Sequence, residues 1–336
     1  MTMTSTPTAM PVSTQSRRSP TSVLRHLTSP DKPYLMTLVL IVLVIIFALA
    51  SPVFFSTSNF LNIGRQTALV TIIAVGMTFV IVSGEIDLSV GAQLALAGIV
   101  ASTAMQATGG QLMAGVIAGL LVGAVVGLAN GLITTGLGIP SFLVTLAMLG
   151  ICRGLALLIS GGQAVLANNS WFWTAFNNGI YFGIPVPVWW TLLALIVGAF
   201  LLHVSSYGRK VYAVGGNKQA ASYSGIRVHR VKILAFVLTG TLAGFAGLIL
   251  TARGQGARPD VGVGLELDVI AAVILGGTSL FGGRGLIVGT LVGSLMIGVI
   301  NNGLTLVGAD SATQAIVKGL IIIVAVTLFT RGLRRR

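Results

Sequence analysis

Cysteine, histidine and acidic residues are scarce in this chain. A single cysteine, Cys152, in 336 residues excludes a disulfide within the chain and a cysteine cluster around a metal. The seven acidic residues and three histidines form no catalytic group and show no metal-ligand spacing. A Gly-Lys pair is missing, which excludes a phosphate-binding loop of the GxxxxGK[ST] type. We therefore expect no enzyme, no bound cofactor and no metal site, and any ATP that drives the protein must be hydrolysed by a partner subunit.

Charge is also scarce, whereas apolar residues are abundant. Only 8% of the residues are charged and 54% are hydrophobic, against about 25% charged in a typical soluble domain. The bilayer is therefore the expected solvent and lipid the expected surroundings. A net charge of +13 invites a nucleic-acid partner, but the basic residues fall in three groups between apolar segments. The excess of Lys and Arg in cytoplasmic loops of membrane proteins explains this placement, so we expect no nucleic acid.

Ten apolar segments are long enough to cross a hydrocarbon core of about 30 Å. The sequence therefore predicts an all-α polytopic membrane protein of about ten transmembrane helices, with an eight-span arrangement containing re-entrant segments as the main alternative. The predicted spans are Leu35–Ala50, Thr67–Ser83, Ser89–Met105, Gln111–Leu137, Pro140–Ser160, Pro187–Val204, Val231–Thr251, Leu265–Phe281, Gly285–Gly303 and Thr313–Thr330.

The chain divides into a membrane domain, 34–330, and two tails. Residues 1–33 are rich in Ser, Thr and Pro and lack apolar periodicity, which predicts a disordered cytoplasmic tail. The sequence at Ala48–Ala50 resembles a signal-peptidase site, but such a leader would be unusually long and further spans follow, so we expect the first span to be retained. Residues 331–336 form a basic tail.

The positions of the basic residues predict the orientation. An even number of spans places both termini on one side, and the basic tails and the loop 205–232 then face the cytoplasm. Arg65, Arg253 and Arg258 would lie outside, a mild exception to the rule. The longest outer loop, 161–185, is rich in aromatic residues, which favour the membrane interface.

Two short matches predict an internal repeat. The stretch 87–94 resembles 260–267, and Asn-Gly-Leu-x-x-x-Gly at 130–136 recurs at 302–308, at nearly the same separation. Spans 2–5 would then correspond to spans 7–10 in opposite orientation, which is the inverted repeat found in many transporters. Glycines recur every fourth residue from Gly115 to Gly131 and from Gly285 to Gly293. We expect both stripes to be surfaces for close helix packing.

Polar residues inside the membrane segments are functional candidates, because they are costly there. Asp87 either caps the third span or lines a pathway, with Arg258 a plausible partner for the corresponding acidic group before span 8. No acidic residue in the middle of a long span has a basic partner on another span, which argues against a cation-coupled carrier.

Arg153 lies in a predicted span, so its guanidinium must either reach the membrane surface or pair with a partner inside the protein. The candidate pathway residues are Asp87, Gln93, Asn130, Thr145, Asn301 and Asn302, which could bind a polar, uncharged solute or bond neighbouring helices instead.

The loop Tyr207–Lys232 contains six of the 20 lysines and arginines. Asn217 is a good helix N-cap, 218–224 is compatible with a helix, and Gly225 suits the position after the C-cap. A helix of about two turns is unstable alone, so it must dock on something. The alternative is an ordinary basic loop that contacts anionic lipid head groups.

Several motifs resemble one family. YAVGGNKQAASYSGIRVHRVK at 212–232 resembles the signature cytoplasmic loop of the membrane permease subunits of monosaccharide ABC importers, the ribose-type permeases. SGEIDLSVGA at 83–92, LGGTSLFGGRGLIVGTLVG at 275–293 and NNGLTLVG at 301–308 are similar to that family as well. The resemblance covers residues 34 to 330.

The resemblance implies the transmembrane subunit of an ATP-driven importer in the bacterial inner membrane, which moves a small neutral sugar from periplasm to cytoplasm by alternating access. It implies three partners: an ATP-binding subunit, often with two fused ATPase domains, an extracytoplasmic sugar-binding protein and a second copy of the chain. The short helix would couple to the ATPase. A permease for nucleosides or branched-chain amino acids, or a stand-alone cation-coupled carrier, is the alternative. The implied coupling residues are Gly215, Gly216, Asn217, Ala220, Ala221, Ser224, Gly225 and Ile226.

Overall fold

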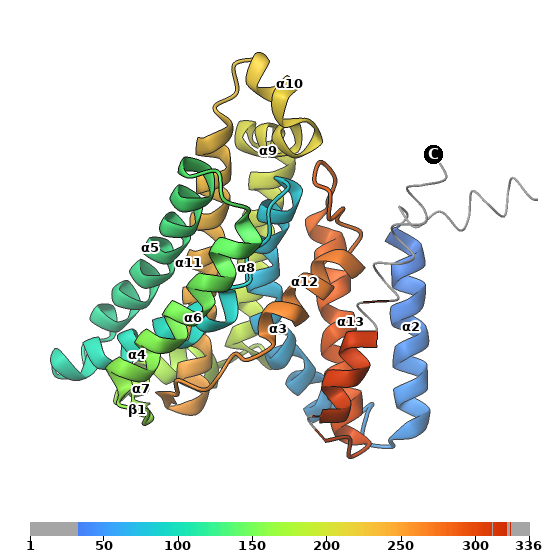
Figure 1. Cartoon of the computed structure of the whole chain (residues 1–336). Helices are drawn as coiled ribbons and strands as arrows, with labels where there is room; N and C mark the ends of the chain where they lie inside the picture. The colour runs from blue at the N-terminus through green and yellow to red at the C-terminus, as the bar shows by residue number, and fades with distance from the viewer. Residues whose placement is uncertain (1–32, 311, 321–322, 324–336) are drawn as a thin grey trace, which may run out of the picture.

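The computed structural model describes residues 33–310, 312–320 and 323, and these residues are almost entirely helical (Figure 1). The predicted tails at 1–33 and 331–336 and much of the predicted last span therefore lie outside the described residues. The helices are α2 (Pro33–Ala50), α3 (Thr57–Val82), α4 (Val90–Ala107), α5 (Leu112–Gly136), α6 (Ser141–Ser160), α7 (Ser170–Trp173), α8 (Val186–Ala199), α9 (Ser206–Gly216), α10 (Lys218–Tyr223), α11 (Val228–Gly254), α12 (Leu265–Leu275) and α13 (Ile287–Leu306).

Short irregular elements complete the fold. Two π-helical turns follow α7 and α8, namely η1 (Thr174–Asn178) and η2 (Phe200–Val204). Strand β1 (Val165–Leu166) pairs antiparallel with β4 (Gly256–Ala257), and β2 (Ile180–Tyr181) pairs with β3 (Ile184–Pro185). Residues 312–320 are also helical. In Figure 1, α9 and α10 lie at one end of the bundle and α7 and β1 at the other.

Seven described helices are long and apolar enough to cross a membrane. Together with the shorter apolar helix Met36–Ala50 in α2, they confirm an all-α polytopic membrane protein, while the count of ten stays a prediction. Helix α3 begins ten residues before its predicted start. Ser56 caps it by accepting a hydrogen bond from the amide of Asn59 at 3.3 Å. The first ten residues of α3 are rich in polar side chains, so hydropathy alone does not identify them as part of the helix.

The predicted span Leu265–Phe281 is wrong as a single membrane-crossing helix. Helix α12 ends at Leu275 after 11 residues, a length of about 16 Å. Residues 276–286 are not helical, and Gly277, Gly282 and Gly283 have positive φ angles of 88°, 82° and 73°. These glycines end the helix in a stretch that apolar side chains alone would have continued.

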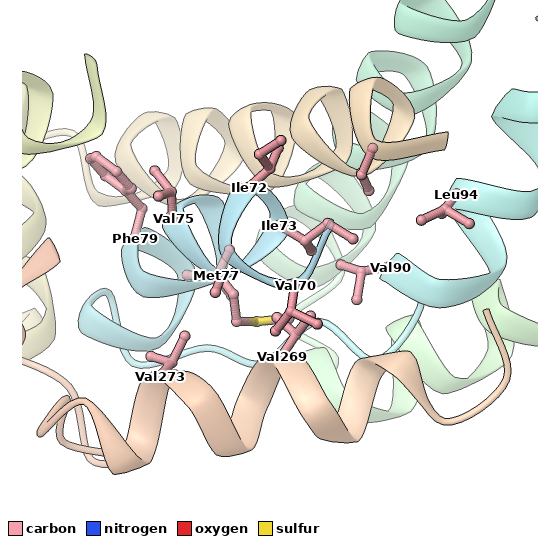
Figure 2. Packing of buried hydrophobic residues seen from close by; sticks show 14 of the residues in the cluster. Val70, Ile72, Ile73, Val75, Met77, Phe79, Val90, Leu94, Val269 and Val273 are labelled. Atoms are coloured by element: carbon pink, nitrogen blue, oxygen red, sulfur yellow. The ribbon is translucent and has the colours of Figure 1, made fainter. Parts of the chain in front are cut away.

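Helix α3 forms the centre of the bundle, and most of its side chains are buried. It packs on α8, α11, α12 and α13. Figure 2 shows the α3 side chains between α11 and α12, with Val70 and Met77 next to Val269. An all-round apolar helix of this kind belongs inside a bundle rather than against lipid.

The packed helix pairs follow the predicted repeat. Helix α4 packs on α5 and α11, and α12 packs on α13 and α3. Helix α5 packs on α11, as α13 packs on α3, while α3 and α11 pack on each other. If α3 is exchanged with α11, α4 with α12 and α5 with α13, the same set of packed pairs results. This is the pattern that two repeats related by a two-fold axis produce.

The glycine stripe of α5 is a packing surface, as predicted. A Cβ added to Gly123 would collide with the carbonyl of Gly240 on α11, and one on Gly127 would collide with the carbonyl of Phe236. Gly293 of α13 lies in the same way against Ala272 of α12. These glycines allow the helix backbones to touch.

Substituting Gly123 by alanine should destabilise the fold, because the added methyl group overlaps the Gly240 carbonyl. We expect a loss of about 1–3 kcal/mol, the usual cost of overpacking, seen as a lower melting temperature of the detergent-solubilised protein. The matched control is Gly150→Ala on α6, where nothing lies within 4 Å of the added methyl. An equal fall in both variants would contradict the close packing of α5 on α11.

Candidate functional site

Two helices of the bundle are interrupted at the same place. The non-helical segment 83–89 joins α3 to α4, and the non-helical segment 255–264 joins α11 to α12. The backbones of Gly91 and Gly262 touch where α4 and α12 begin, so a Cβ on either would collide with the carbonyl of the other. Two helix N-termini, each with a partial positive charge, thus meet, that of α4 buried and that of α12 half-exposed. Broken helices of this kind border the binding sites of many transporters.

A buried polar cluster lies where α4 begins. The Ser89 amide donates a hydrogen bond to Asp87 Oδ1 at 2.9 Å, and Gln93 Nε2 and Asn130 Nδ2 donate to Ser89 Oγ at 2.5 and 2.9 Å. The same two amides lie 3.5 and 3.4 Å from Asp87 Oδ2. All four side chains are fully buried. The structure therefore brings together three of the predicted pathway residues, Asp87, Gln93 and Asn130, and adds Ser89.

This cluster stabilises a carboxylate with neutral donors. Asp87 accepts from the amide and hydroxyl of Ser89 and lies at the N-terminus of α4, where the helix dipole favours a negative charge. The buried oxygens Gln93 Oε1 and Asn130 Oδ1 have no hydrogen-bond partner among the described residues. Asp87 bonds the amide of Ser89, the N-cap residue, but no side chain caps α4 itself, and the pathway role of Asp87 stays a prediction.

Thr145 lies beside the cluster but contacts backbone. The Leu88 amide donates to Thr145 Oγ1 at 3.0 Å, and the Ile86 amide donates to Ser141 Oγ at 3.1 Å. Both hydroxyls come from α6. They supply the partners that the backbone of 83–89 lacks because it is not helical.

Asn301 and Asn302 do not join this cluster. Asn302 and Asn59 exchange two side-chain hydrogen bonds of 2.8 and 3.0 Å between α13 and α3. Asn301 Nδ2 donates to Asp268 Oδ2 at 3.3 Å. An asparagine thus contacts a carboxylate in each half of the bundle, but the positions are not equivalent, since the repeat aligns Asp87 with Asp260 and Asn130 with Asn302.

Two buried ion pairs escaped the sequence reasoning. Lys232 Nζ of α11 contacts Glu85 Oε1, and the side chains are only 10% and 13% exposed. Lys318 Nζ lies 2.9 Å from Asp268 Oδ2. The second pair joins two predicted spans. From the sequence we expected no acidic residue in the middle of a long span to have a basic partner on another span, and Asp268 lies in the first turn of the short helix α12. The opposite signs of these residues were visible in the sequence, but their pairing depends on how the helices pack.

Arg153 of α6 pairs with backbone. Its Nη1 atom donates to the carbonyls of Pro259 and Val261 at 2.6 and 2.7 Å. The predicted partnership of Arg258 with the acidic group before span 8 is confirmed, because Arg258 makes a two-fold contact with Asp260 at 3.0 and 2.8 Å. The hydrogen bonds from the exposed Arg258 guanidinium lower the pKa of the Asp260 carboxyl.

Two cavities lie on either side of the polar cluster. One, of about 160 Å³, opens near α10 and is lined by Glu85, Lys232, Thr134 and His229, among others. The other, of about 270 Å³, lies between the N-terminal half of α4, the C-terminal part of α11 and the segment 256–261. The first cavity is lined by residues at the start of α11 and the second by residues at its end. Each cavity borders one of the two non-helical segments.

The loop 205–232 contains the predicted short helix. The Asn217 side chain accepts a hydrogen bond from the Ala220 amide at 3.0 Å, and α10 runs over Lys218–Tyr223. Gly225 follows the C-cap with a φ angle of 81°. Helix α9 precedes it and was not predicted, although Ser205 caps it through the Gly208 amide at 3.1 Å.

The predicted coupling residues differ in exposure. Ala221 is buried, only 4% exposed, on the side where α10 packs on α9. Ala220 faces outward, next to Tyr223, which is 91% exposed. A partner protein can therefore reach one face of α10. The other exposed coupling residues are Gly216, Asn217, Ser224 and Gly225, while Gly215 and Ile226 are half-buried.

The model of one protein family, described as the branched-chain amino acid transport system / permease component, matches residues 59–326. The chain is 48% identical over 291 residues to the ribose import permease protein RbsC of Bacillus subtilis, covering 86% of this chain and 90% of the relative. It is 43% identical to RbsC of Escherichia coli K12 (85% and 90% covered). It is 39% identical to the L-arabinose ABC transporter permease protein AraH of Azospirillum brasilense (89% and 88%). No solved structure matches.

Replacing Glu85 by glutamine should destabilise the protein, because Lys232 would keep a buried charge without its partner. We expect a loss of about 3 kcal/mol, the lower end of what breaking a buried ion pair costs, measured by thermal unfolding in detergent. Lys232→Met should destabilise the protein as well, because it leaves Glu85 without its partner. The exchanged pair Glu85→Lys with Lys232→Glu should recover part of the loss, and no recovery would contradict a direct charge interaction.

Proposed function

The chain belongs to the family of branched-chain amino acid transport system permease components, and on this premise we propose that it is the transmembrane subunit of an ATP-driven importer of a small neutral sugar. The observation that carries this proposal is the 48% identity to a ribose import permease over 86% of the chain. An L-arabinose permease is 39% identical. Nucleosides and branched-chain amino acids are not favoured as substrates, since the relatives named above are sugar permeases. Ribose and arabinose are both aldopentoses, so an aldopentose is the first substrate to test.

The chemistry of the central cluster supports a neutral, polyhydroxylated solute. Gln93 and Asn130 each have one buried oxygen without a partner in the described part of the chain. Such acceptors suit the hydroxyl donors of a sugar. The carboxylate of Asp87 is already occupied by donors from Ser89, so it is not free to hold a cationic solute.

The importer needs partners. An ATP-binding subunit and a substrate-binding protein complete it, and this chain transports rather than catalyses. The finer arrangement is part of the proposal: two copies of the chain form the pathway in the bacterial inner membrane, two ATPase domains fused in one chain hydrolyse the ATP, and the sugar-binding protein delivers its ligand from the periplasm.

The exposed face of α10 is proposed to sit in a groove of the ATPase. Helix α10 packs on α9, and at the end of α9 Gly215 lies directly against the carbonyl of Val82. The Gly283 amide donates to the same carbonyl at 2.9 Å. A displacement of α10 would therefore reach the end of α3 and the segment 83–89. Rigid-body movement of this kind can switch access between the two faces of the membrane.

Uptake by the reconstituted transporter tests the function. Proteoliposomes that contain this chain, its ATP-binding subunit and its binding protein should accumulate labelled ribose or arabinose only when ATP is supplied on the side of the membrane that carries the ATPase. Leucine and a nucleoside serve as competing substrates and should not be accumulated. Accumulation by this chain alone, driven by an ion gradient, would refute the proposal.

Substituting Ala220 by arginine should abolish transport and the stimulation of ATP hydrolysis by the binding protein, because Ala220 lies on the exposed face of α10. The fold should be unaffected, since the side chain points away from α9. The control is Ala221→Arg, which should lower the melting temperature as well, because Ala221 is buried. Normal coupled uptake by the Ala220 variant would contradict the docking of α10.

A further inference from the structure

Helix α6 holds the first non-helical segment through two hydroxyl groups. Ser141 Oγ and Thr145 Oγ1 accept from the amides of Ile86 and Leu88 at 3.1 and 3.0 Å. Thr145 Oγ1 also lies 3.4 Å from the Ile86 carbonyl. The two side chains are four residues apart and so lie on one face of the helix. Both are buried, so water does not compete for these bonds.

The same helix holds the second non-helical segment through Arg153. One guanidinium nitrogen donates to the carbonyls of both Pro259 and Val261, at 2.6 and 2.7 Å. Hydrogen bonds from a charged donor are stronger than neutral ones. An unwound backbone in a membrane protein needs such partners inside the protein. Arg153 thereby takes the place of the helical hydrogen bonds that these carbonyls lack.

Helix α6 is suited to link the two non-helical segments, which it contacts near its start and in its second half. Its buried residues form one stripe along the helix, which faces α4, and its remaining surface is largely exposed. Thr145 and Arg153 are separated by about 12 Å along the axis, and they share no hydrogen-bond partner. The contact between Gly91 and Gly262 joins the segment 255–264 to the first turn of α4, which directly follows the segment 83–89. The buried stripe consists of Ser141, Val144, Thr145, Met148, Cys152 and Ala156.

We propose that α6 and the segments 83–89 and 255–264 move as one rigid unit during transport, with Thr145 and Arg153 as its positioning residues. The role in transport rests on the proposed function, whereas the rigidity of the unit does not. Because Val82 contacts Gly215 and Gly283, the unit receives the displacement of α10 at one end. At its other end the segment 256–261 borders the cavity of about 270 Å³. One movement therefore changes both cavities at once.

Hydrogen–deuterium exchange of the full chain in nanodiscs tests the rigid unit without any substrate. In Arg153→Met, exchange should rise not only in 255–264 but also in 83–89, by about tenfold if opening of the unit becomes that much easier. Thr145→Val should in turn raise exchange in 255–264. The matched controls are Arg65→Met, whose guanidinium donates to Asn62 of its own helix, and Thr103→Val, whose hydroxyl bonds within α4. Changes confined to the mutated end would overturn the proposal.

Uptake by the reconstituted transporter gives the second measurement. Sites about 12 Å apart with separate partners normally contribute independently. If each single variant lowers uptake tenfold, independent roles predict a hundredfold loss in Thr145→Val with Arg153→Met. The rigid unit predicts a loss close to that of the worse single variant. A fully multiplicative loss would contradict it.

Conservative variants separate positioning from a general loss of structure. Thr145→Ser keeps the hydroxyl oxygen and should restore both exchange protection and uptake. Arg153→Lys keeps the charge but offers no planar guanidinium, so it should restore exchange protection and uptake in part. If Arg153→Met does not insert into the membrane, Arg153→Lys replaces it in the exchange experiment. Failure of the proposed function would appear differently, as absence of ATP-dependent sugar uptake by the unmodified protein, and the exchange experiment would still decide the fate of the unit.

Discussion

A backbone that leaves the helical conformation inside a bilayer must find every hydrogen-bond partner within the protein. Two segments of this chain, 83–89 and 255–264, impose that requirement. Hydroxyls of Ser141 and Thr145 bond two backbone amides of the first, and the guanidinium of Arg153 bonds two carbonyls of the second. This explains why an otherwise apolar helix, α6, contains these polar residues. It also explains why α4 and α12 can begin inside the bundle, with their N-termini touching at Gly91 and Gly262.

The two repeats share an architecture but not the side chains that stabilise it. The packed pairs exchange under the symmetry, and in each half an asparagine faces a carboxylate at the short or broken helix: Asn130 with Asp87 and Asn301 with Asp268. The repeat aligns Asp87 with Asp260 rather than with Asp268. The neighbours of Asp87 and Asp268 also differ, because Lys318 pairs with Asp268 while neutral donors surround Asp87. Two halves with the same helix packing can therefore differ in their polar side chains. One half holds a carboxylate among neutral donors, and the other holds a carboxylate paired with a lysine.

Sequence reasoning succeeded where the signal is local. Apolar runs predict the long spans, and the cap at Asn217 with the glycine at 225 predicts α10, because both depend on neighbours in the chain. It failed for α12, since hydropathy averaged over a window does not register glycines that adopt positive φ. It also missed Glu85–Lys232 and Asn59–Asn302, whose partners are brought together only by packing between distant helices. Of the six predicted pathway residues the structure brings Asp87, Gln93 and Asn130 together and places Asn301 and Asn302 elsewhere, and the function of all six in the pathway stays a prediction.

The internal charges bear on the energy source. A cation-coupled carrier needs a membrane-embedded carboxylate that can take up and release its cation. In the described part of the chain, Glu85 and Asp268 are each held by a lysine, and Asp87 accepts hydrogen bonds from Ser89 at a helix N-terminus. Releasing Glu85 or Asp268 would first require breaking its ion pair with lysine, at a cost of about 3–5 kcal/mol for a buried pair, and releasing Asp87 would break its hydrogen bonds with Ser89. The proposed movement driven through α10 avoids that cost, because the contacts of Gly215 and Gly283 with the Val82 carbonyl need no change in charge.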